Sequence, residues 1–258
     1  MKYFNFKTTT VLFLFCLNLT CFSQITPPGL GKDVNTVSWF ALGLKQNLNK
    51  SKTASSTTYI GHSSSSTIDD TNPFNKSALY VVNQEISHHF KEHWKYSGAL
   101  SYRWQNFYHL TAPYDRDKSL SRQEIRTYAR FSYLTKIRQL DFSLTYRPEF
   151  RWFYNSDFTP YHESFQFRSR IAGKLSKSLS ARQKIIFTTE LLFATSKTEK
   201  WSSLEYHESR FSLYYSMLFP KQKTTFNIGY MNNLLGTQFS KDTHYLAIDI
   251  TLNNLFHI

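Results

Sequence analysis

Apolar and polar side chains alternate along residues 139–152. Successive side chains of a β-strand point to opposite faces, so this period of two predicts a strand with one apolar face and one charged face. The apolar parity carries Leu140, Phe142, Leu144, Tyr146, Phe150 and Trp152. The polar parity carries Asp141, Ser143, Thr145, Arg147, Glu149 and Arg151. Few folds need a charged strand face this long opposite a continuous apolar one.

The same alternation recurs along the chain. Most of the segments are longer than an ordinary strand of about 5–6 residues and suit a tilted bilayer crossing of about 9–11 residues. They predict an all-β fold, a transmembrane antiparallel up-and-down β-barrel of about ten strands. The predicted strands are 36–48, 78–90, 94–105, 122–136, 139–152, 163–175, 184–195, 205–219, 223–231 and 243–254.

Long and short connections alternate between these strands, which is typical of outer-membrane barrels with long outer loops and tight periplasmic turns. Ten strands would place both termini in the periplasm. The Ser/Thr-rich run at 51–67 is expected to be a flexible exposed part of the first long loop. Eight or twelve strands remain open, because 49–77 is long enough for two short strands and 223–231 is the weakest segment.

The N-terminus predicts a cleaved signal peptide at 1–23, with Lys2 and Lys7 before a short apolar run. Cleavage would remove Cys16 and Cys21 and leave one β-barrel domain over 24–258. A lipoprotein modified at Cys21 and a buried N-terminal helix are the alternatives. Export and the strand pattern together predict location in a bacterial outer membrane.

Aromatic residues make up 17% of the chain. Trp39, Trp94, Trp104 and Trp152 fall near the ends of predicted strands, where a membrane interface favours Trp and Tyr. The alternative is a soluble barrel or sandwich with an aromatic core. That alternative leaves the alternation of loop lengths unexplained.

The polar parities collect charges of both signs inside the predicted barrel, including Glu85, Arg103, Glu124, Asp141 and Asp249. Because arginine forms bidentate pairs with carboxylates, we expect an Arg–Glu ladder that mostly occludes the lumen. The alternative is a narrow arginine-lined path for small acidic solutes. The candidate binding residues are Arg126, Arg130, Arg147, Glu149, Arg151, Arg168, Arg170, Glu190, Glu208 and Arg210.

The segment Arg147-Pro148-Glu149-Phe150-Arg151 resembles the Arg-Pro-Glu-aromatic-Arg signature of an outer-membrane barrel family, the domain of unknown function 2490. Two strands of that family are similar to Gln123-Glu124-Ile125-Arg126 and to Phe167-Arg168-Ser169-Arg170. Its closing hairpin is similar to Gly229-Tyr230 followed by 244–248. The resemblance covers roughly 36–254. It implies a fold and a location and no catalytic residues.

Other sites receive little support. His88, His89 and His93 straddle a strand end, so they are not expected to converge on a metal. The pairs His207/Ser209 and His162/Ser164 suggest a lipid-modifying enzyme, but residues two apart on one strand lie about 7 Å apart, beyond hydrogen-bond reach.

The formal net charge is +13, from 31 Lys and Arg against 18 Asp and Glu. These basic residues are too scattered for nucleic acid. Lysines in the outer loops are expected to meet lipopolysaccharide phosphates. Other expected partners are outer-membrane lipids and the barrel-assembly machinery, and no cofactor is expected. The lysines concerned are Lys52, Lys118, Lys197 and Lys200.

Overall fold

The computed structural model describes residues 25–30 and 34–256, without the side chains of 118–120. The predicted signal peptide lies outside the described residues. The part that is described holds no helix long and apolar enough to cross a membrane. Its strands are β1 (Thr36–Asn47), β2 (Ala54–Ser65), β3 (Lys76–Lys91), β4 (Trp94–Tyr108), β5 (Arg116–Ile137), β6 (Leu140–Tyr154), β7 (Pro160–Ser178), β8 (Gln183–Lys197), β9 (Glu205–Phe219), β10 (Thr224–Leu235) and β11 (Lys241–Asn253).

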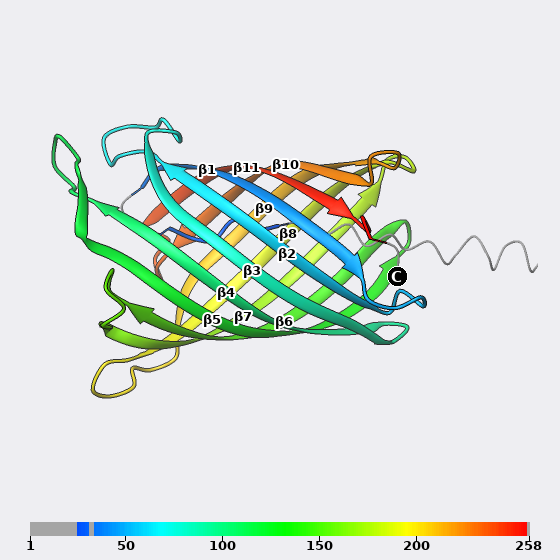
Figure 1. The fold of residues 1–258 in the computed structure, drawn as a ribbon, viewed down its shortest axis with the longest axis horizontal. Helices are drawn as coiled ribbons and strands as arrows, with labels where there is room; N and C mark the ends of the chain where they lie inside the picture. Colours follow the sequence, from blue (N-terminus) through cyan, green and yellow to red (C-terminus); the bar gives the residue numbers. More distant parts are fainter. Residues whose placement is uncertain (1–24, 31–33, 257–258) are drawn as a thin grey trace, which may run out of the picture.

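The eleven strands close into one barrel, which confirms the predicted all-β fold (Figure 1). Each strand pairs antiparallel with the next along the chain, and β1 pairs parallel with β11, from Thr36↔His244 to Lys45↔Asn253. With an odd number of strands in an up-and-down barrel, the first and last strands point the same way. The closing pair is therefore parallel.

The additional strand is β2, which the sequence analysis assigned to a flexible loop. Residues 54–65 pair along their length with β1 and with β3. Serine and threonine give β2 almost no apolar alternation, and the outward-facing polar side chains satisfy one another instead. Gln84 on β3 donates to Ser56 at 2.7 Å and accepts a hydrogen bond from Thr58. The prediction of a loop at 51–67 is therefore wrong over 54–65.

Connections at one end of the barrel are mostly longer than those at the other end (Figure 1). The long-loop end carries 66–75, 109–115, 155–159, 198–204 and 236–240, and the short-turn end carries 48–53, 92–93, 138–139, 179–182 and 220–223. Because of β2, β1 begins at the long-loop end while β11 finishes at the short-turn end. The predicted placement of both termini on one side does not hold for the barrel strands, and Lys52 lies in the 48–53 connection at the short-turn end rather than at the long-loop end.

Inward-facing and outward-facing side chains alternate along each strand of the barrel wall. Leu42, Ile60 and Val82 stand side by side on the outside and are 48–55% exposed. Trp94 also lies outside at 44% exposure, whereas Trp39 is fully buried. The prediction that Trp39 lies at a membrane interface is therefore wrong. Its indole packs inside the barrel over Gly61, which has no side chain to obstruct it.

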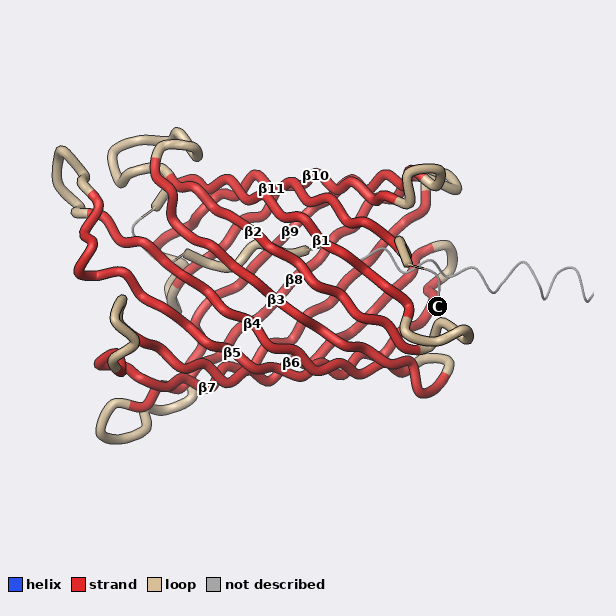
Figure 2. The backbone as a smooth tube through the Cα atoms, in the orientation of Figure 1, coloured by secondary structure: helices blue, strands red, loops and turns tan. Residues whose placement is uncertain are grey.

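The interior has an apolar side around Trp39, where Leu79, Ile186 and Tyr214 are also buried. Ile25 belongs to this cluster, and Leu30 packs against it. Residues 25–30 therefore lie inside the barrel, where Figure 2 shows them as a tan segment surrounded by strands. Most of the buried charged side chains lie on β4 to β9.

Candidate functional site: the arginine network

Strands β4 to β9 place seven arginines and four glutamates inside the barrel, joined by ion pairs into one cluster that we call the arginine network. Where a strand contributes more than one residue, these residues are two apart in sequence, because only alternate side chains face inward. The network consists of Arg103, Glu124, Arg126, Arg147, Glu149, Arg151, Arg168, Arg170, Glu190, Glu208 and Arg210.

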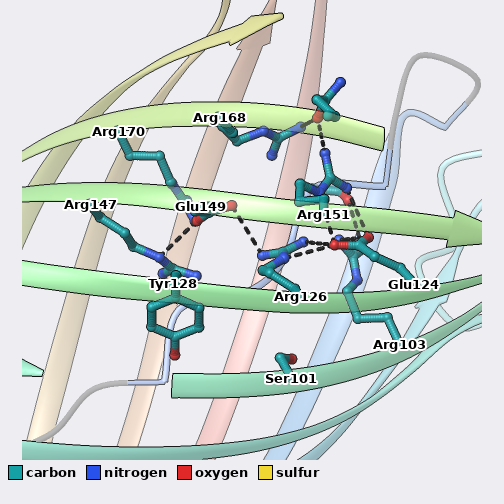
Figure 3. Close-up of polar contacts among 12 residues, drawn as sticks. Ser101, Arg103, Glu124, Arg126, Tyr128, Arg147, Glu149, Arg151, Arg168 and Arg170 are labelled. Carbon is teal, nitrogen blue, oxygen red and sulfur yellow. Dashed lines mark hydrogen bonds and ion pairs between the residues drawn. The ribbon is translucent and has the colours of Figure 1, made fainter. Parts of the chain in front are cut away.

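Glu124 is the first centre of the network (Figure 3). Its Oε2 lies 2.8 Å from Nη2 of Arg151 and 3.2 Å from Nη1 of Arg103. Its Oε1 lies 2.7 Å from Nη2 of Arg126. All four side chains are less than one-tenth exposed, and the carboxylate is surrounded by donors from three strands.

Glu149 is the second centre and is completely buried. Its Oε1 lies 2.7 Å from Nε of Arg147 and 2.9 Å from Nη1 of Arg170, and its Oε2 lies 3.5 Å from Nη1 of Arg126. Arg126 links the two centres (Figure 3). The guanidinium of Arg147 also lies 3.7 Å from the centre of the Tyr128 ring, a cation–π geometry.

The network continues to β9 through Glu190 and Glu208. Nη2 of Arg170 lies 2.5 Å from Oε2 of Glu190, and Nη2 of Arg210 lies 2.6 Å from Oε1 of Glu208. Arg168 is more loosely bound, with its Nη1 3.5 Å from the same Glu208 oxygen. These pairs connect neighbouring strands. Removing one partner of such a buried ion pair destabilises the protein, because it leaves the other charge buried without its partner.

Nine of the ten candidate binding residues of the sequence analysis belong to the network. Arg130 lies apart, with its side chain 37% exposed and its Nη2 3.6 Å from Glu85. Arg103 and Glu124 were placed inside the barrel but not among the binding candidates, and the structure shows them at the centre. Alternation identifies such inward charges but not their partners, since pairing depends on register. Whether the residues bind a solute stays a prediction.

The segment 25–30 is the part of the site that the sequence did not indicate. Arg210 donates to the carbonyl of Pro27 at 3.4 Å, and Arg103 donates to the carbonyl of Gly29 at 3.3 Å. On the other side, the Leu30 amide donates to the Tyr245 hydroxyl at 3.0 Å. The segment therefore bridges the apolar and charged sides of the interior. It has no periodicity from which this position is predictable.

A cavity of about 170 Å³ lies between this segment and the network. Residues 25–29 form one side, and seven arginines with Lys174 line much of the rest. Among the described residues, its lining includes two carboxylates, those of Glu85 and Glu190. Glu124, Glu149 and Glu208 are buried and do not line it, so positive side chains predominate on its wall.

Several of the histidines and serines singled out earlier contact other groups. His93 contacts the Leu134 carbonyl at 2.9 Å, and the ring of His88 packs on Tyr96. Ser209 accepts a hydrogen bond from the Tyr206 hydroxyl at 2.8 Å. Over the described ranges, no three His, Cys, Asp or Glu side chains gather as metal ligands would.

A different pair does meet on the outer wall. Nε2 of His62 lies 3.0 Å from Oγ of Ser77, which also lies 2.9 Å from the Tyr80 hydroxyl. The two residues stand on β2 and β3, on either side of a register shift. Sequence analysis did not predict this pair, because it assigned the β2 residues to a loop.

The fold and its interior define a closed β-barrel protein with a buried arginine–glutamate network. The chain belongs to the family described as protein of unknown function (DUF2490), whose model matches residues 38–243. This match confirms the family resemblance drawn from the Arg-Pro-Glu-aromatic-Arg segment. No curated protein matches the chain.

Proposed function

We propose that this chain is a bacterial outer-membrane β-barrel with a structural role in the envelope and a charged, mostly occluded lumen that does not conduct solutes. The outer wall carries this proposal. Every strand contributes an apolar side chain that is at least 37% exposed, and soluble monomers rarely expose apolar patches of more than a few hundred Å². One such residue from each strand, in order, is Leu42, Ile60, Val82, Leu100, Phe131, Leu144, Ile171, Phe187, Leu213, Ile228 and Leu246.

The interior supports a closed barrel rather than a channel for acidic solutes. A conducting path needs mobile water along its length, whereas the arginines of the network are paired across strands. Segment 25–30 adds backbone across the lumen, held by Arg103, Arg210 and Tyr245. A mobile anion would have to displace several ion pairs at once.

The proposed orientation places the long-loop end outside the cell and the short turns in the periplasm, as in other outer-membrane barrels. Lys200, in the 198–204 loop, would then meet lipopolysaccharide phosphates, and Lys52 would not. Assembly would use the barrel-assembly machinery, which serves proteins of this class.

Refolding into lipid vesicles tests the membrane assignment. Folded outer-membrane barrels resist unfolding by detergent until heated, so the unheated protein should migrate faster on a gel than the heated one. Fractionation of cells should place it in the outer membrane. Recovery of a soluble, detergent-free monomer would overturn the assignment.

Conductance in a planar bilayer tests whether the interior is closed. The folded protein should insert without steady single-channel steps. Anion-selective steps that diminish in the Arg168→Gln variant would instead establish the channel. Insertion is verified separately by the heat-dependent gel shift, so that silence is not mistaken for a failure to insert.

The His62–Ser77 pair favours a second candidate function, hydrolysis of a lipid ester at the outer wall. A nucleophile within hydrogen-bond reach of a base is the arrangement that acyl transfer needs. Ser77 Oγ would attack the ester carbonyl as His62 takes its proton and returns it to the departing alcohol. Water would then release the fatty acid from Ser77.

Fatty-acid release from phospholipid vesicles tests this second function. Release by the wild-type barrel, lost in Ser77→Ala and kept in Ser64→Ala, would establish it. Ser64 is the matched control because it pairs directly with Ser77 across the ladder. A folded wild-type barrel that releases no fatty acid would exclude the activity on that substrate.

A further inference from the structure

The arginine network carries more positive charge than its own carboxylates neutralise. It contains seven guanidinium groups and four glutamates, an excess of three positive charges. Six of the seven arginine side chains are less than one-tenth exposed, and Arg147 is 14% exposed. Removing a charge from water is unfavourable unless an opposite charge goes with it. The interior therefore requires anions beyond those the network provides.

The excess charge faces the cavity beneath segment 25–30. The arginines and Lys174 on its wall outnumber Glu85 and Glu190, and the other network carboxylates are not among its lining residues. Its volume is about 170 Å³. A buried cavity of about 150 Å³ is known to accommodate a molecule the size of benzene, so a phosphate group fits with room to spare.

The cavity wall also offers unused hydrogen-bond donors. The Nε atoms of Arg103, Arg168, Arg170 and Arg210 are buried and have no hydrogen-bond partner. The hydroxyl of Thr188, on the same wall, is buried without a partner as well. Guanidinium groups favour the oxygens of carboxylates and phosphates, which accept two parallel hydrogen bonds from one arginine.

We propose that this cavity binds one small oxyanion with two or more negative charges, of the size of phosphate or a small phosphate monoester. A chloride ion would neutralise only one of the three excess charges and offers no fixed acceptor geometry. The backbone of residues 25–29 covers the anion from one side, so that it is held within the barrel rather than passed through it. The site is independent of where the barrel resides.

Equilibrium dialysis of the full-length folded protein in detergent against radiolabelled inorganic phosphate tests the site. We expect one phosphate per barrel, displaced by sulfate and retained in about 100 mM chloride, where exposed charges are screened. Phosphate that is displaced by chloride as readily as by sulfate, or that does not bind, would overturn the proposal.

Two matched variants locate the anion. Arg168→Gln should weaken phosphate binding by about tenfold or more, because Arg168 lines the cavity and is only loosely tied to Glu208. Arg122→Gln removes an interior arginine that packs on Phe153 and does not line the cavity, and should leave binding nearly unchanged. Equal losses in both variants would show that phosphate responds to general charge and would refute the site.

Thr188→Glu covers the case in which Arg168→Gln does not fold. It places a carboxylate on the wall of the cavity, where it should take over the role of the bound anion. We expect this variant to fold, to lose phosphate binding and to show a thermal unfolding midpoint that no longer rises with phosphate. Retention of wild-type phosphate binding would contradict the proposed position.

Discussion

The indole ring of Trp39 occupies the space that a side chain at position 61 would need. The two residues lie on β1 and β2, and Trp39 is fully buried against Gly61 inside the barrel. Tyr214 and Gly229 repeat this relationship between β9 and β10. In both places an inward-facing aromatic ring packs on the backbone of a glycine in the adjacent strand. This contact fixes the register of the two strands.

Gly61→Ala should therefore destabilise the barrel by about 1–3 kcal/mol, the usual cost of overpacking a filled interior. The measurement is the free energy of unfolding in urea, followed by tryptophan fluorescence in detergent micelles. Gly98→Ala is the control, because a Cβ at position 98 meets no atom within 4 Å. Equal effects at the two positions would mean that the contact with Trp39 does not constrain the fold.

Glu149→Gln should be among the most damaging single substitutions in the chain. It removes the negative charge that Arg126, Arg147 and Arg170 share, and breaking a buried ion pair from one side costs about 3–5 kcal/mol. The same urea titration measures it. Glu199→Gln, in the exposed 198–204 loop, makes the same chemical change and should leave stability unaltered. A small effect at Glu149 would indicate that the network relaxes around the loss.

Leu213→Arg tests the outer wall directly. Leu213 is 53% exposed near the middle of β9, and an arginine on the lipid face near the midplane of a bilayer costs about 2–4 kcal/mol. Leu204→Arg changes a residue that is 55% exposed in a long loop, where the same side chain is hydrated. The folded fraction in lipid vesicles should fall for Leu213→Arg only. A wall that faces water would tolerate both.

The 66–75 loop should loosen in acid. Hydrogen bonds from the Asn72 amide and the Asn75 side chain, both at 2.9 Å, hold the pKa of Asp70 below its usual 3.8. Because the folded-state pKa is depressed, its stabilisation is complete at neutral pH and is lost as the pH falls through that lowered value. Hydrogen-exchange protection of 66–75 should decrease below about pH 3.8. In Asp70→Asn the protection should not change over this range.

Alternation predicted most of the barrel: eight of the eleven strands were found with bounds within three residues of those observed, and β5 and β10 were found in part. It failed at β2, where Ser56, Thr58 and Gln84 bond to one another on the outer wall and leave no apolar face to detect. It also failed at Trp39, whose residue type suits an interface as well as an interior. The inward charges were accessible to sequence analysis, since parity alone assigns them. Their pairing was not, because Arg126 reaches both Glu124 and Glu149 only in the observed register.

The position of segment 25–30 was beyond sequence analysis, and cysteine labelling provides its test. Thr26 lines the interior cavity, so Thr26→Cys in a chain with Cys16 and Cys21 replaced by serine should react slowly with a membrane-impermeant maleimide. Ser203→Cys, exposed in the 198–204 loop, should react quickly in the same background. Adding Tyr245→Phe removes the hydroxyl that accepts the Leu30 amide hydrogen bond, and labelling at position 26 should accelerate as the segment loosens. Equal labelling rates at positions 26 and 203 in the folded barrel would show that segment 25–30 lies mostly outside the barrel and does not cover the cavity.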